Sequence, residues 1–385
     1  MTKRRKIAVV TTSRADYSHL YWPLRELSVR PNVDLKLIVL GSHLSPEFGL
    51  TVQEIEKDGI EIAASLESLL SSDTDVGMAK SIGIAIISLT DLLGSMRPDI
   101  LLLIADRYEL LAPASVALAL RIPIAHIEGG EISEGAVDDA VRNAVTKMSH
   151  IHFTSTEKAR ERVISMGEES WRVCRAGAPS LDHLVRSKRW TRNELENHLG
   201  IDLSKPSIVV AYHPVTIAQN TTYEASALFE ALSERSEQLF FCYPNADAGS
   251  RSLSTRTRKF IDETGKGRVF VNLDAVVYFS LLANVDLVLG NSSSGIMETA
   301  SLQLPTVNIG LRQYGREQPR NVLDARADKQ SILAKIEEAR SHRFKSSLGG
   351  MTNPYGDGHA AERIADVLSS VPLNSDLLRK RSPEP

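Results

Sequence analysis

The stretch His126-Ile-Glu-Gly-Gly-Glu-Ile-Ser-Glu-Gly-Ala-Val-Asp-Asp-Ala-Val-Arg-Asn-Ala-Val-Thr-Lys-Met-Ser-His150 decides the fold. It follows the apolar run 122–125 and precedes a second apolar run at 151–154. After Ala136 the apolar residues recur at helical spacing and predict one buried face, formed by Val137, Ala140, Val141, Ala144, Val145 and Met148. A buried strand, a helix and another buried strand predict a parallel β-α-β unit.

The connection between that strand and that helix is rich in carboxylates. Glu128 and Glu131 flank two glycines, and Asp138 and Asp139 lie on the first turn of the predicted helix. Loops at strand ends carry the chemistry of α/β folds. Crowded acids also shift one another's pKa values, as proton transfer at neutral pH requires. The loop is therefore a candidate site for acid–base chemistry.

The same alternation of strand and helix runs along the whole chain. Strands are predicted at 7–11, 35–40, 100–104, 122–126 and 151–154, and again at 208–212, 239–243, 269–272, 287–290 and 306–309. A charged segment at 186–205 separates the two series, and two further helices are predicted at 331–340 and 360–369. We therefore predict an α/β fold of two Rossmann-like domains, 1–185 and 186–370, facing each other across a cleft. The tail 371–385 is predicted to be disordered.

The composition excludes several classes of protein. With 385 residues the chain is long enough for about two domains. A net charge of -3 gives no electrostatic reason to expect nucleic acid or an anionic membrane. No uninterrupted apolar stretch approaches the roughly 18 residues of a spanning helix. The two cysteines form neither a disulfide framework nor a metal motif, so a reducing cytoplasm is expected.

A turn of small residues follows the predicted strand 287–290. Its sequence, Gly290-Asn-Ser-Ser-Ser-Gly295, opens a predicted helix that contains Glu298. Free backbone N–H groups, the helix dipole and three hydroxyls suit a diphosphate. The alternative is an ordinary helix N-cap, since serine and asparagine are favoured there. Glu298 could accept hydrogen bonds from a ribose diol, or only favour the dipole.

Further polar residues follow other predicted strands. Arg14 comes after the first strand, where no G-x-G-x-x-G motif is present, and could clamp a phosphate or lie on the surface. Asp106 and Arg107 follow the apolar run 100–104, at the rim of the sheet or at a helix N-cap. His213 is either a site residue or a packed or solvated histidine. Asn245 and Arg312 lie in polar loops that are not specific by themselves.

Taken together, these segments resemble the UDP-N-acetylglucosamine 2-epimerases, and within that family the hydrolysing branch of sialic-acid-type biosynthesis. The resembling stretches are 13–18, 106–107, 126–131, 138–142, 146–147, 213–216, 244–250, 290–295 and 353–358. Each is weak alone, but they run in family order from about residue 6 to residue 368.

The resemblance implies a fold and a set of site residues. The family fold is the two-domain arrangement of GT-B glycosyltransferases, with the nucleotide mostly on the second domain. By resemblance, the catalytic residues are Asp106, Glu128, Asp138 and His213. The implied substrate-binding residues are Arg14, Ser18, Arg107, Glu131, Asp139, Arg142, Asn245, Ser292, Ser293, Glu298 and Arg312. Among them, Ser292 and Ser293 would bind the diphosphate and Glu298 the ribose.

The implied reaction fits these residue types. A base removes the C2 proton of the sugar while UDP leaves from C1, and water then adds to the resulting 2-acetamidoglucal. Reprotonation of C2 from the other face gives N-acetylmannosamine and UDP. This needs an acid and a base on different faces, and cations for the departing diphosphate. We predict a cytoplasmic hydrolysing UDP-N-acetylglucosamine 2-epimerase, a homodimer or homotetramer, with no cofactor and no metal.

Two positions depart from the family pattern and leave the substrate open. Ala105 stands where glycine commonly precedes Asp-Arg, and Asn143 stands where relatives usually carry histidine. The loop 133–136 resembles a variant of bacterial sialic- and legionaminic-acid enzymes, so the substrate could be a UDP-2,4-diacetamido-trideoxyhexose. Three rival functions fit the same fold: a non-hydrolysing epimerase, a GT-B glycosyltransferase, and a catalytically silent nucleotide-sugar sensor.

Overall fold

The computed structural model describes residues 4–70, 72, 74–134, 136–214, 224–243, 250–271 and 273–381. The chain forms two compact units. Unit 1 comprises Met1–Glu131, Asp138–Asp182 and Tyr355–Pro385, and unit 2 comprises Ile132–Val137 and His183–Pro354. These units differ from the predicted ranges in two places. The C-terminal segment returns to unit 1, and the far half of the acidic loop belongs to unit 2.

Unit 1 is built on a parallel sheet of seven strands. They are β1 (Arg5–Thr11), β2 (Val33–Leu40), β3 (Ile62–Leu66), β4 (Ile100–Ile104), β5 (Ile124–Ile127), β6 (Ile151–Thr154) and β7 (Val173–Arg175). Their order in the sheet is β3-β2-β1-β4-β5-β6-β7. The order reverses between β1 and β4, and such a switch point is where α/β sheets bind ligands beyond the carboxyl ends of their strands.

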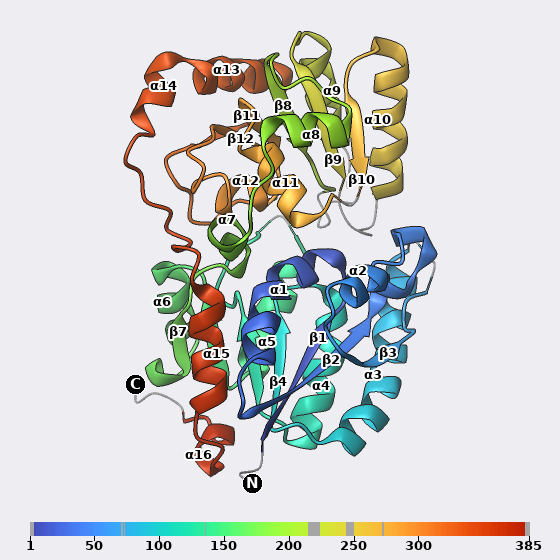
Figure 1. Cartoon of the computed structure of the whole chain (residues 1–385), viewed down its shortest axis with the longest axis vertical. Coiled ribbons are helices and arrows are strands. Elements are labelled where there is room, and N and C mark those ends of the chain that lie inside the picture. The colour runs from blue at the N-terminus through green and yellow to red at the C-terminus, as the bar shows by residue number, and fades with distance from the viewer. Residues whose placement is uncertain are drawn as a thin grey trace. The chain divides into compact units, whose positions relative to one another are not determined.

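Helices cover both faces of this sheet (Figure 1). One face carries α1 (Arg14–Ser28), α2 (Val52–Lys57) and α15 (Ala360–Ser370), and the other carries α3 (Asp75–Met96), α4 (Leu111–Leu120) and α5 (Asp138–Met148). The remaining helices are α6 (Glu157–Ser165) and α16 (Ser375–Leu378), with α7 (Asp182–Arg186) where the chain leaves unit 1 for unit 2.

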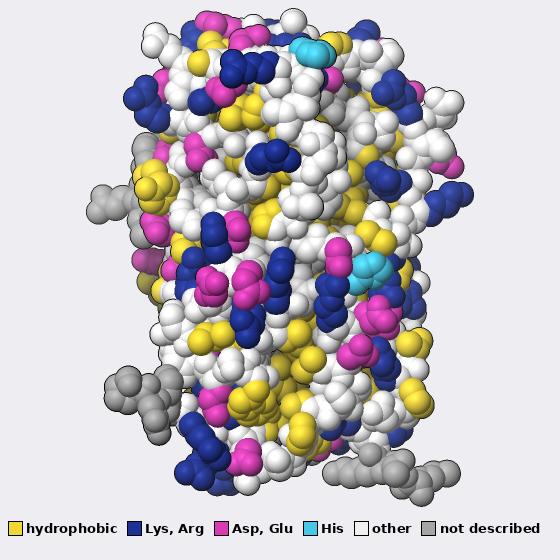
Figure 2. Space-filling model, turned by 90° about the vertical axis from the view of Figure 1, so that its left-hand side faces the viewer, with side chains coloured by type: hydrophobic (Ala, Val, Ile, Leu, Met, Phe, Trp, Pro, Cys, Tyr) yellow, Lys and Arg dark blue, Asp and Glu magenta, His cyan; other side chains and the backbone are white. Residues whose placement is uncertain are grey.

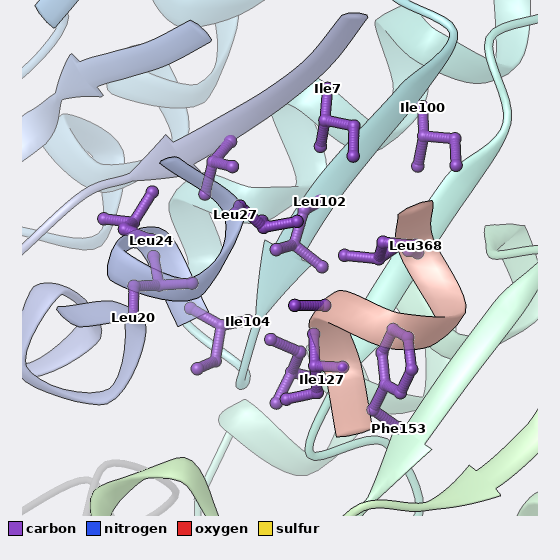
Figure 3. Close-up of a cluster of buried hydrophobic side chains, with 14 of the residues drawn as sticks. Ile7, Leu20, Leu24, Leu27, Ile100, Leu102, Ile104, Ile127, Phe153 and Leu368 are labelled. Atoms are coloured by element: carbon purple, nitrogen blue, oxygen red, sulfur yellow. The ribbon is translucent and has the colours of Figure 1, made fainter. Parts of the chain in front are cut away.

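The core between α1, α15 and the sheet follows from the apolar spacing of these elements. Leu20, Leu24 and Leu27 lie on one side of α1 and are fully buried. Figure 3 shows them and Leu368 of α15 gathered around strand residues such as Leu102. Burying each such leucine contributes about 1.5–3 kcal/mol. This packing fixes α1, and with it the loop between β1 and α1, against the strand ends.

Helix α3 bears on the expectation that the chain has no uninterrupted apolar stretch long enough to span a membrane. It is long and apolar enough, by length and composition alone, to cross a membrane, and it is the single such helix in the described ranges. The statement that no uninterrupted apolar stretch reaches this length still holds, because Lys80, Asp91 and several small polar residues interrupt the apolar run of α3. In the structure α3 packs beside α4, with Ala85, Leu89 and Leu93 buried against the sheet.

The C-terminal segment, predicted to be disordered, is ordered as far as the structure describes it. Leu377 of α16 is buried. The Arg172 guanidinium donates hydrogen bonds to the carbonyl oxygens of Asp376, Leu377 and Arg379 at 2.7, 2.8 and 2.9 Å. Lys380 forms an ion pair with Glu168 at 2.7 Å. The polar composition of the tail does not predict this packing, because most of the contacts are made by backbone carbonyl oxygens, which any sequence carries. Residues 382–385 lie outside the described part of the chain.

Unit 2 repeats the same architecture with six parallel strands. They are β8 (Ser207–Ala211), β9 (Gln238–Tyr243), β10 (Arg268–Val271), β11 (Leu287–Gly290), β12 (Thr306–Ile309) and β13 (Val322–Ala325), in the order β10-β9-β8-β11-β12-β13. One face carries α9 (Ala225–Ser233), α10 (Ser250–Thr264) and α13 (Lys329–Arg340), and the other carries α8 (Arg192–Leu199) and α11 (Ala275–Leu282). The short helices are α12 (Ser294–Met297) and α14 (His342–Ser347). The predicted α/β class with two Rossmann-like units is confirmed.

Candidate functional site

Arg142 organises the acidic residues at the carboxyl edge of the first sheet. Its guanidinium is buried and forms an ion pair with Asp106, which follows β4. Its Nη1 also donates to the Glu131 carbonyl oxygen at 3.0 Å and lies 3.4 Å from Oδ1 of Asp139. Four of the predicted site residues are therefore brought together within unit 1. The guanidinium holds the half-buried Asp106 carboxylate in a fixed position and favours its ionised form.

Glu128 has a partner that the sequence did not reveal. The Nδ1 atom of His19, on α1, lies 2.9 Å from Oε1 of Glu128, and both side chains retain some contact with solvent, 24% for His19 and 10% for Glu128. The backbone of Glu128 has a φ of 65°, in the left-handed region that non-glycine residues rarely adopt. A residue held in this region costs free energy and persists only where the surrounding structure fixes it. A carboxylate bonded to an imidazole can accept a proton and pass it on.

The predicted residue Ser18 neighbours His19 and is half-buried, as is Asp138 at the start of α5. Asn143, at the position where relatives usually carry histidine, donates to Oδ2 of Asp139 at 3.1 Å. An amide does not titrate near neutral pH, so the Asn143 side chain orients Asp139 and does not exchange a proton with it.

Beneath these carboxylates lies His126, the first residue of the stretch that decides the fold. It is fully buried, with Nε2 2.8 Å from the Ala105 carbonyl oxygen and Nδ1 3.2 Å from Thr146 Oγ1. Burial lowers the pKa of His126 to about 4, so the imidazole is neutral at pH 7. Ala105 has a φ of 66°. Glycine adopts that conformation without strain, which explains why glycine is common in the family at the position that Ala105 occupies.

A second buried cluster holds Arg107. Its guanidinium forms an ion pair with Glu109 at 2.9 Å and lies close enough to Asp16 to interact electrostatically. Burial raises the pKa of both Asp16 and Glu109, and the charge of Arg107 opposes the rise. Asp16 accepts a hydrogen bond from the Thr12 N–H at 3.1 Å. The cluster orients Arg107 after the end of β4, and Arg107 and Arg14 both lie close enough to His43 to lower its pKa.

We expect the stability of the protein to fall on mild acidification because of its buried histidines. Burial lowers the pKa of His43 to about 3, and of His126 and His150 to about 4, from 6.5. The unfolded chain therefore binds more protons than the folded one below about pH 6.5, and stability is lost as the pH falls from there toward 4. Asp16 and Glu109 contribute to the pH dependence of stability in the opposite direction, because burial raises their pKa values.

A comparison with His126→Gln isolates the contribution of one of these histidines. Urea unfolding at pH 7.5 and 5.5 measures the change for each protein. The variant should lose less stability between the two pH values than the wild type. Equal losses in the two proteins would contradict the neutral, buried state of His126.

In unit 2, the turn after β11 is anchored to the end of β8. Gly290 has a φ of 146°, and a Cβ added there would lie 2.0 Å from the Ala211 carbonyl oxygen, so only glycine fits. The Asn291 side chain accepts from the His213 N–H at 2.6 Å and donates to the His213 carbonyl at 2.9 Å. The predicted small-residue turn and the predicted histidine are thus one structural element.

The helix expected after this turn is much shorter than predicted. Helix α12 covers Ser294–Met297, and Glu298 is its C-cap, not a residue of its interior. Ser293 makes no side-chain capping bond, although Ser292 Oγ accepts from the Ser294 N–H at 3.3 Å. A single helical turn supplies little macrodipole, so the turn's hydroxyls and N–H groups, not the helix, are what it offers to an anion.

Arg312 reaches the same turn from the loop after β12. Its Nη1 donates to the Asn291 carbonyl at 3.2 Å, and the neighbouring Gln313 donates to the same oxygen at 2.9 Å. Glu298 is buried in unit 2. His213, Ser292, Ser293 and Arg312 therefore lie at one carboxyl edge of the second sheet, whereas Asn245 falls outside the described residues.

The acidic loop itself passes from one unit to the other. Arg316 donates from Nε to the Ile132 carbonyl at 3.2 Å, and its Nη2 lies 3.4 Å from Ser133 Oγ. The Glu134 N–H donates to the Tyr314 carbonyl at 3.4 Å. Glu131 is thus the last residue of the loop in unit 1, and the residues after it pack on unit 2 until Asp138.

Surface charge and metal ligands give no sign of another kind of site. Among the residues with described positions, no group of three or more histidine, cysteine or carboxylate side chains is placed to hold a metal ion. On the face shown in Figure 2, acidic and basic side chains are interspersed, as expected for a net charge of -3.

Two parallel α/β units with polar residues at the strand ends have the architecture of proteins that bind ligands at the carboxyl edges of their sheets. The family model described as UDP-N-acetylglucosamine 2-epimerase matches residues 25–369, and the chain belongs to this family. The predicted resemblance is confirmed.

Relatives and solved structures agree with this assignment. The UDP-N,N′-diacetylbacillosamine 2-epimerase (hydrolyzing) of Legionella pneumophila is 37% identical over 378 residues, 98% of each chain. The GDP/UDP-N,N′-diacetylbacillosamine 2-epimerase (hydrolyzing) of Campylobacter jejuni is 34% identical, over 89% of this chain and 90% of the relative. The structure of the UDP-GlcNAc 2-epimerase from Neisseria meningitidis bound to UDP-GlcNAc matches with a TM-score of 0.80 at 18% identity, over 94% of this chain and 99% of that one. The chain is a hydrolysing nucleotide-sugar 2-epimerase.

Proposed function

We propose that the enzyme hydrolyses a UDP-2,4-diacetamido-trideoxyhexose, UDP-N,N′-diacetylbacillosamine, to UDP and the free 2-epimeric sugar. The observation that supports this substrate most is the 37% identity, over nearly the full length, to a relative named for it. This sugar is the alternative substrate predicted from the sequence. UDP-N-acetylglucosamine, the main prediction, is now the second candidate, favoured by the UDP-N-acetylglucosamine 2-epimerase of Neisseria meningitidis, which is 29% identical over 95% of each chain.

The proposed reaction has two steps that balance with one water. A base takes the proton from C2, the C1–C2 double bond forms, and the bond from C1 to the UDP oxygen breaks. Water then adds its oxygen to C1, and a proton adds to C2 from the opposite face. The carboxylates Asp106, Glu128 and Asp138 are proposed to exchange these protons.

Two of these carboxylates are held in different electrostatic settings. Asp106 is paired with the permanently charged Arg142, which favours a carboxylate that stays ionised. Glu128 is bonded to the imidazole of His19 at 2.9 Å, and histidine is the side chain type best suited to proton exchange. We therefore propose that the His19–Glu128 pair exchanges the C2 proton on one face of the sugar and that another of the three carboxylates exchanges it on the opposite face, while Glu131 and Asp139 orient the sugar beside Asp106.

The departing diphosphate needs positive charge and N–H donors. We propose that the turn with Ser292 and Ser293 and the guanidinium of Arg312 bind it in unit 2, and that Glu298 binds the ribose. Arg14, Arg107 and His213 are proposed to complete the phosphate and sugar contacts, with Ser18 and Asn245 in supporting roles.

Replacing His19 with glutamine tests the proton relay. Glutamine can still bond to Glu128 but cannot titrate, so kcat should fall about a hundredfold with little change in KM. The limb of the pH–rate profile that reports the imidazole should disappear, and added imidazole should restore part of the rate. His342→Gln, on an exposed helix, is the control. An unchanged pH profile in His19→Gln would reduce His19 to a structural contact.

Steady-state assays with the two candidate substrates test the proposed sugar. Release of free UDP is followed for UDP-N,N′-diacetylbacillosamine and UDP-N-acetylglucosamine under the same conditions. We expect kcat/KM to favour the diacetamido sugar by about a hundredfold or more, because a site shaped for the 4-acetamido group leaves polar groups unpaired against a hydroxyl. A preference for UDP-N-acetylglucosamine would favour the second candidate. A cytoplasmic location and a homo-oligomeric assembly stay predictions.

A further inference from the structure

The loop 311–316, which follows β12, contacts two separate segments of unit 2. Arg312 and Gln313 both donate to the Asn291 carbonyl oxygen, in the turn proposed to bind the diphosphate, at 3.2 and 2.9 Å. The other half of the loop holds the segment Ile132–Val137 (the strap), which is the part of the acidic loop that belongs to unit 2. Backbone hydrogen bonds of 2.9 and 3.2 Å between residues three apart keep the loop compact. One short loop therefore joins the diphosphate turn to the strap.

Arg316 fixes the strap to unit 2. Its Nε donates to the Ile132 carbonyl oxygen at 3.2 Å, and its Nη2 lies 3.4 Å from Ser133 Oγ. Its Nη1 lies 3.6 Å from Sδ of Met297, in α12, the short helix that follows the diphosphate turn. Ser133 and Ala136 of the strap are buried. A planar guanidinium whose three nitrogen atoms all have partners holds those partners in one geometry, so the strap has a defined place on unit 2.

The two ends of the strap are joined directly to carboxylates of unit 1. Glu131 precedes the strap, and Asp138, the first residue of α5, follows it. The Glu131 carbonyl oxygen accepts from Arg142 at 3.0 Å, and the next carbonyl along the chain is the one that Arg316 holds. The Cα atoms of successive residues are only about 3.8 Å apart, so the position of Ile132 limits the positions open to Glu131.

We propose that Arg316 is a positioning residue that couples occupation of the diphosphate turn to the placement of Glu131 and Asp138, through the strap. This inference rests on the proposed function, which assigns the diphosphate to that turn. A diphosphate bound by Arg312 restricts the loop 311–316, and the contacts of Arg316 pass the restriction to the strap. Arg316 itself contacts neither the sugar nor the diphosphate. The carboxylates are held in place while the nucleotide is bound, and a misplacement of about 1 Å can cost about a hundredfold in rate.

Gly315 gives the strap room beside the loop. Its φ is 81°, in the left-handed region that favours glycine. A Cβ added there would lie 2.6 Å from Cγ2 of Ile132 and 2.9 Å from Oε1 of Glu134. Alanine would therefore displace the strap while the donors of Arg316 stay in the protein. The close approach of the loop to the strap thus has a sequence requirement of its own, independent of the arginine.

Substitutions at Arg316 test the positioning role in the full chain. Arg316→Met keeps the bulk of the side chain without its donors, so kcat for the preferred UDP-sugar should fall about thirtyfold or more. The affinity for UDP, measured by titration calorimetry, should stay within about threefold of the wild type. Arg316→Lys keeps a charged donor and should recover part of kcat. Arg343→Met, at an exposed position of α14, is the control and should keep wild-type kcat.

Gly315→Ala tests the same coupling without changing a charge. It should lower kcat as Arg316→Met does. Gly350→Ala should not, because Gly350 has a similar φ of 69° and an added Cβ there would meet nothing within 4 Å. Wild-type kcat in both Arg316→Met and Gly315→Ala would overturn the proposal. A fall in UDP affinity that matches the fall in kcat would also overturn it, since Arg316 would then bind the nucleotide itself.

Hydrogen exchange of the backbone amides tests the coupling with UDP alone, without turnover. In the wild type, UDP should slow exchange about tenfold both in the segment 290–298 and in the acidic loop. In Arg316→Met, UDP should still slow exchange in 290–298 but no longer in the acidic loop. Equal protection of the acidic loop in both proteins would contradict the role of Arg316. In the wild type, protection of 290–298 alone would contradict only the coupling, whereas protection of neither segment would contradict the proposed nucleotide site itself.

Discussion

Glutamine in place of Glu128 is expected to lower kcat by about a thousandfold or more while UDP still binds. The substitution keeps the shape of the side chain and a hydrogen bond to His19, and it removes the group proposed to exchange the C2 proton on one face of the sugar. The site for the nucleotide lies on unit 2 in the proposed mechanism, so the affinity for UDP should stay within about threefold, which is less than 1 kcal/mol. Turnover is measured by release of UDP, and binding by titration calorimetry.

The matched control for Glu128→Gln is Glu61→Gln, which removes the same charge at an exposed position of unit 1. The control should retain wild-type turnover. If Glu128→Gln also retained it, Glu128 would have no part in proton transfer, and the strained backbone and the bond to His19 would need another explanation. If UDP binding were lost as well, the effect would be on folding or on the nucleotide site.

The second large effect is expected at Arg142, because one buried guanidinium holds Asp106, Asp139 and the Glu131 carbonyl. Arg142→Met fills similar space without the charge and leaves Asp106 without its buried counter-charge. Removing one partner of a buried ion pair typically costs about 3–5 kcal/mol. Urea unfolding should show a loss of this order, and turnover should fall even where the variant is fully folded, because Asp106 is no longer held.

A double-mutant cycle separates the free energy of the Arg142–Asp106 interaction from the general cost of changing a buried side chain. Asp106→Asn removes the charge left behind in Arg142→Met, so the double variant should be less destabilised than the sum of the two single variants. Arg142→Lys should fall between the wild type and Arg142→Met, since a lysine keeps the charge without the fork. Strict additivity would contradict the coupling between Arg142 and Asp106.

The central strands were predictable, as was the edge strand β10 with its apolar run at 269–271, whereas the other three edge strands were not. Strands such as β4 and β11 are buried on both faces and therefore appear as continuous apolar runs. Strand β3 alternates between half-buried and exposed residues at the edge of its sheet, and β7 has only three residues. Neither carries the apolar run by which a buried parallel strand is identified. Strand β13, also at an edge, was missed for the same reason.

Helix α5 was predicted correctly as a helix, but its buried face was predicted wrongly. Its bounds begin at Asp138 as predicted, but Val137, Ala140 and Ala144 of the predicted inner face are exposed. The buried face includes Arg142 and Thr146 instead. Apolar periodicity assigns the buried side by hydrophobicity, and here two polar residues occupy it because they bond to the site and to His126. Polar residues on the buried face of a helix are expected at a functional site.

The candidate site was predictable wherever it depends on strand ends. Topology alone places the residues after β4, β5 and β11 at the carboxyl edges of their sheets. His19 was not predictable in this way. It lies on the body of a helix and meets Glu128 across 109 positions of sequence, a contact that only the packing of α1 against the sheet creates. Asp16 was missed because its interaction with Arg107 also joins distant parts of the sequence, whereas Glu109 pairs with Arg107 only two residues away and was missed although the contact is local.

The central claim is that carboxylates at the carboxyl edge of the first sheet exchange the C2 proton of a UDP-sugar. Proton NMR of the enzyme with UDP-N,N′-diacetylbacillosamine in deuterated water measures this most directly. We predict free UDP together with a free sugar of inverted configuration at C2 that carries one solvent deuterium at that carbon. A released sugar that keeps its original C2 hydrogen and configuration would mean simple hydrolysis at C1, and would contradict the account.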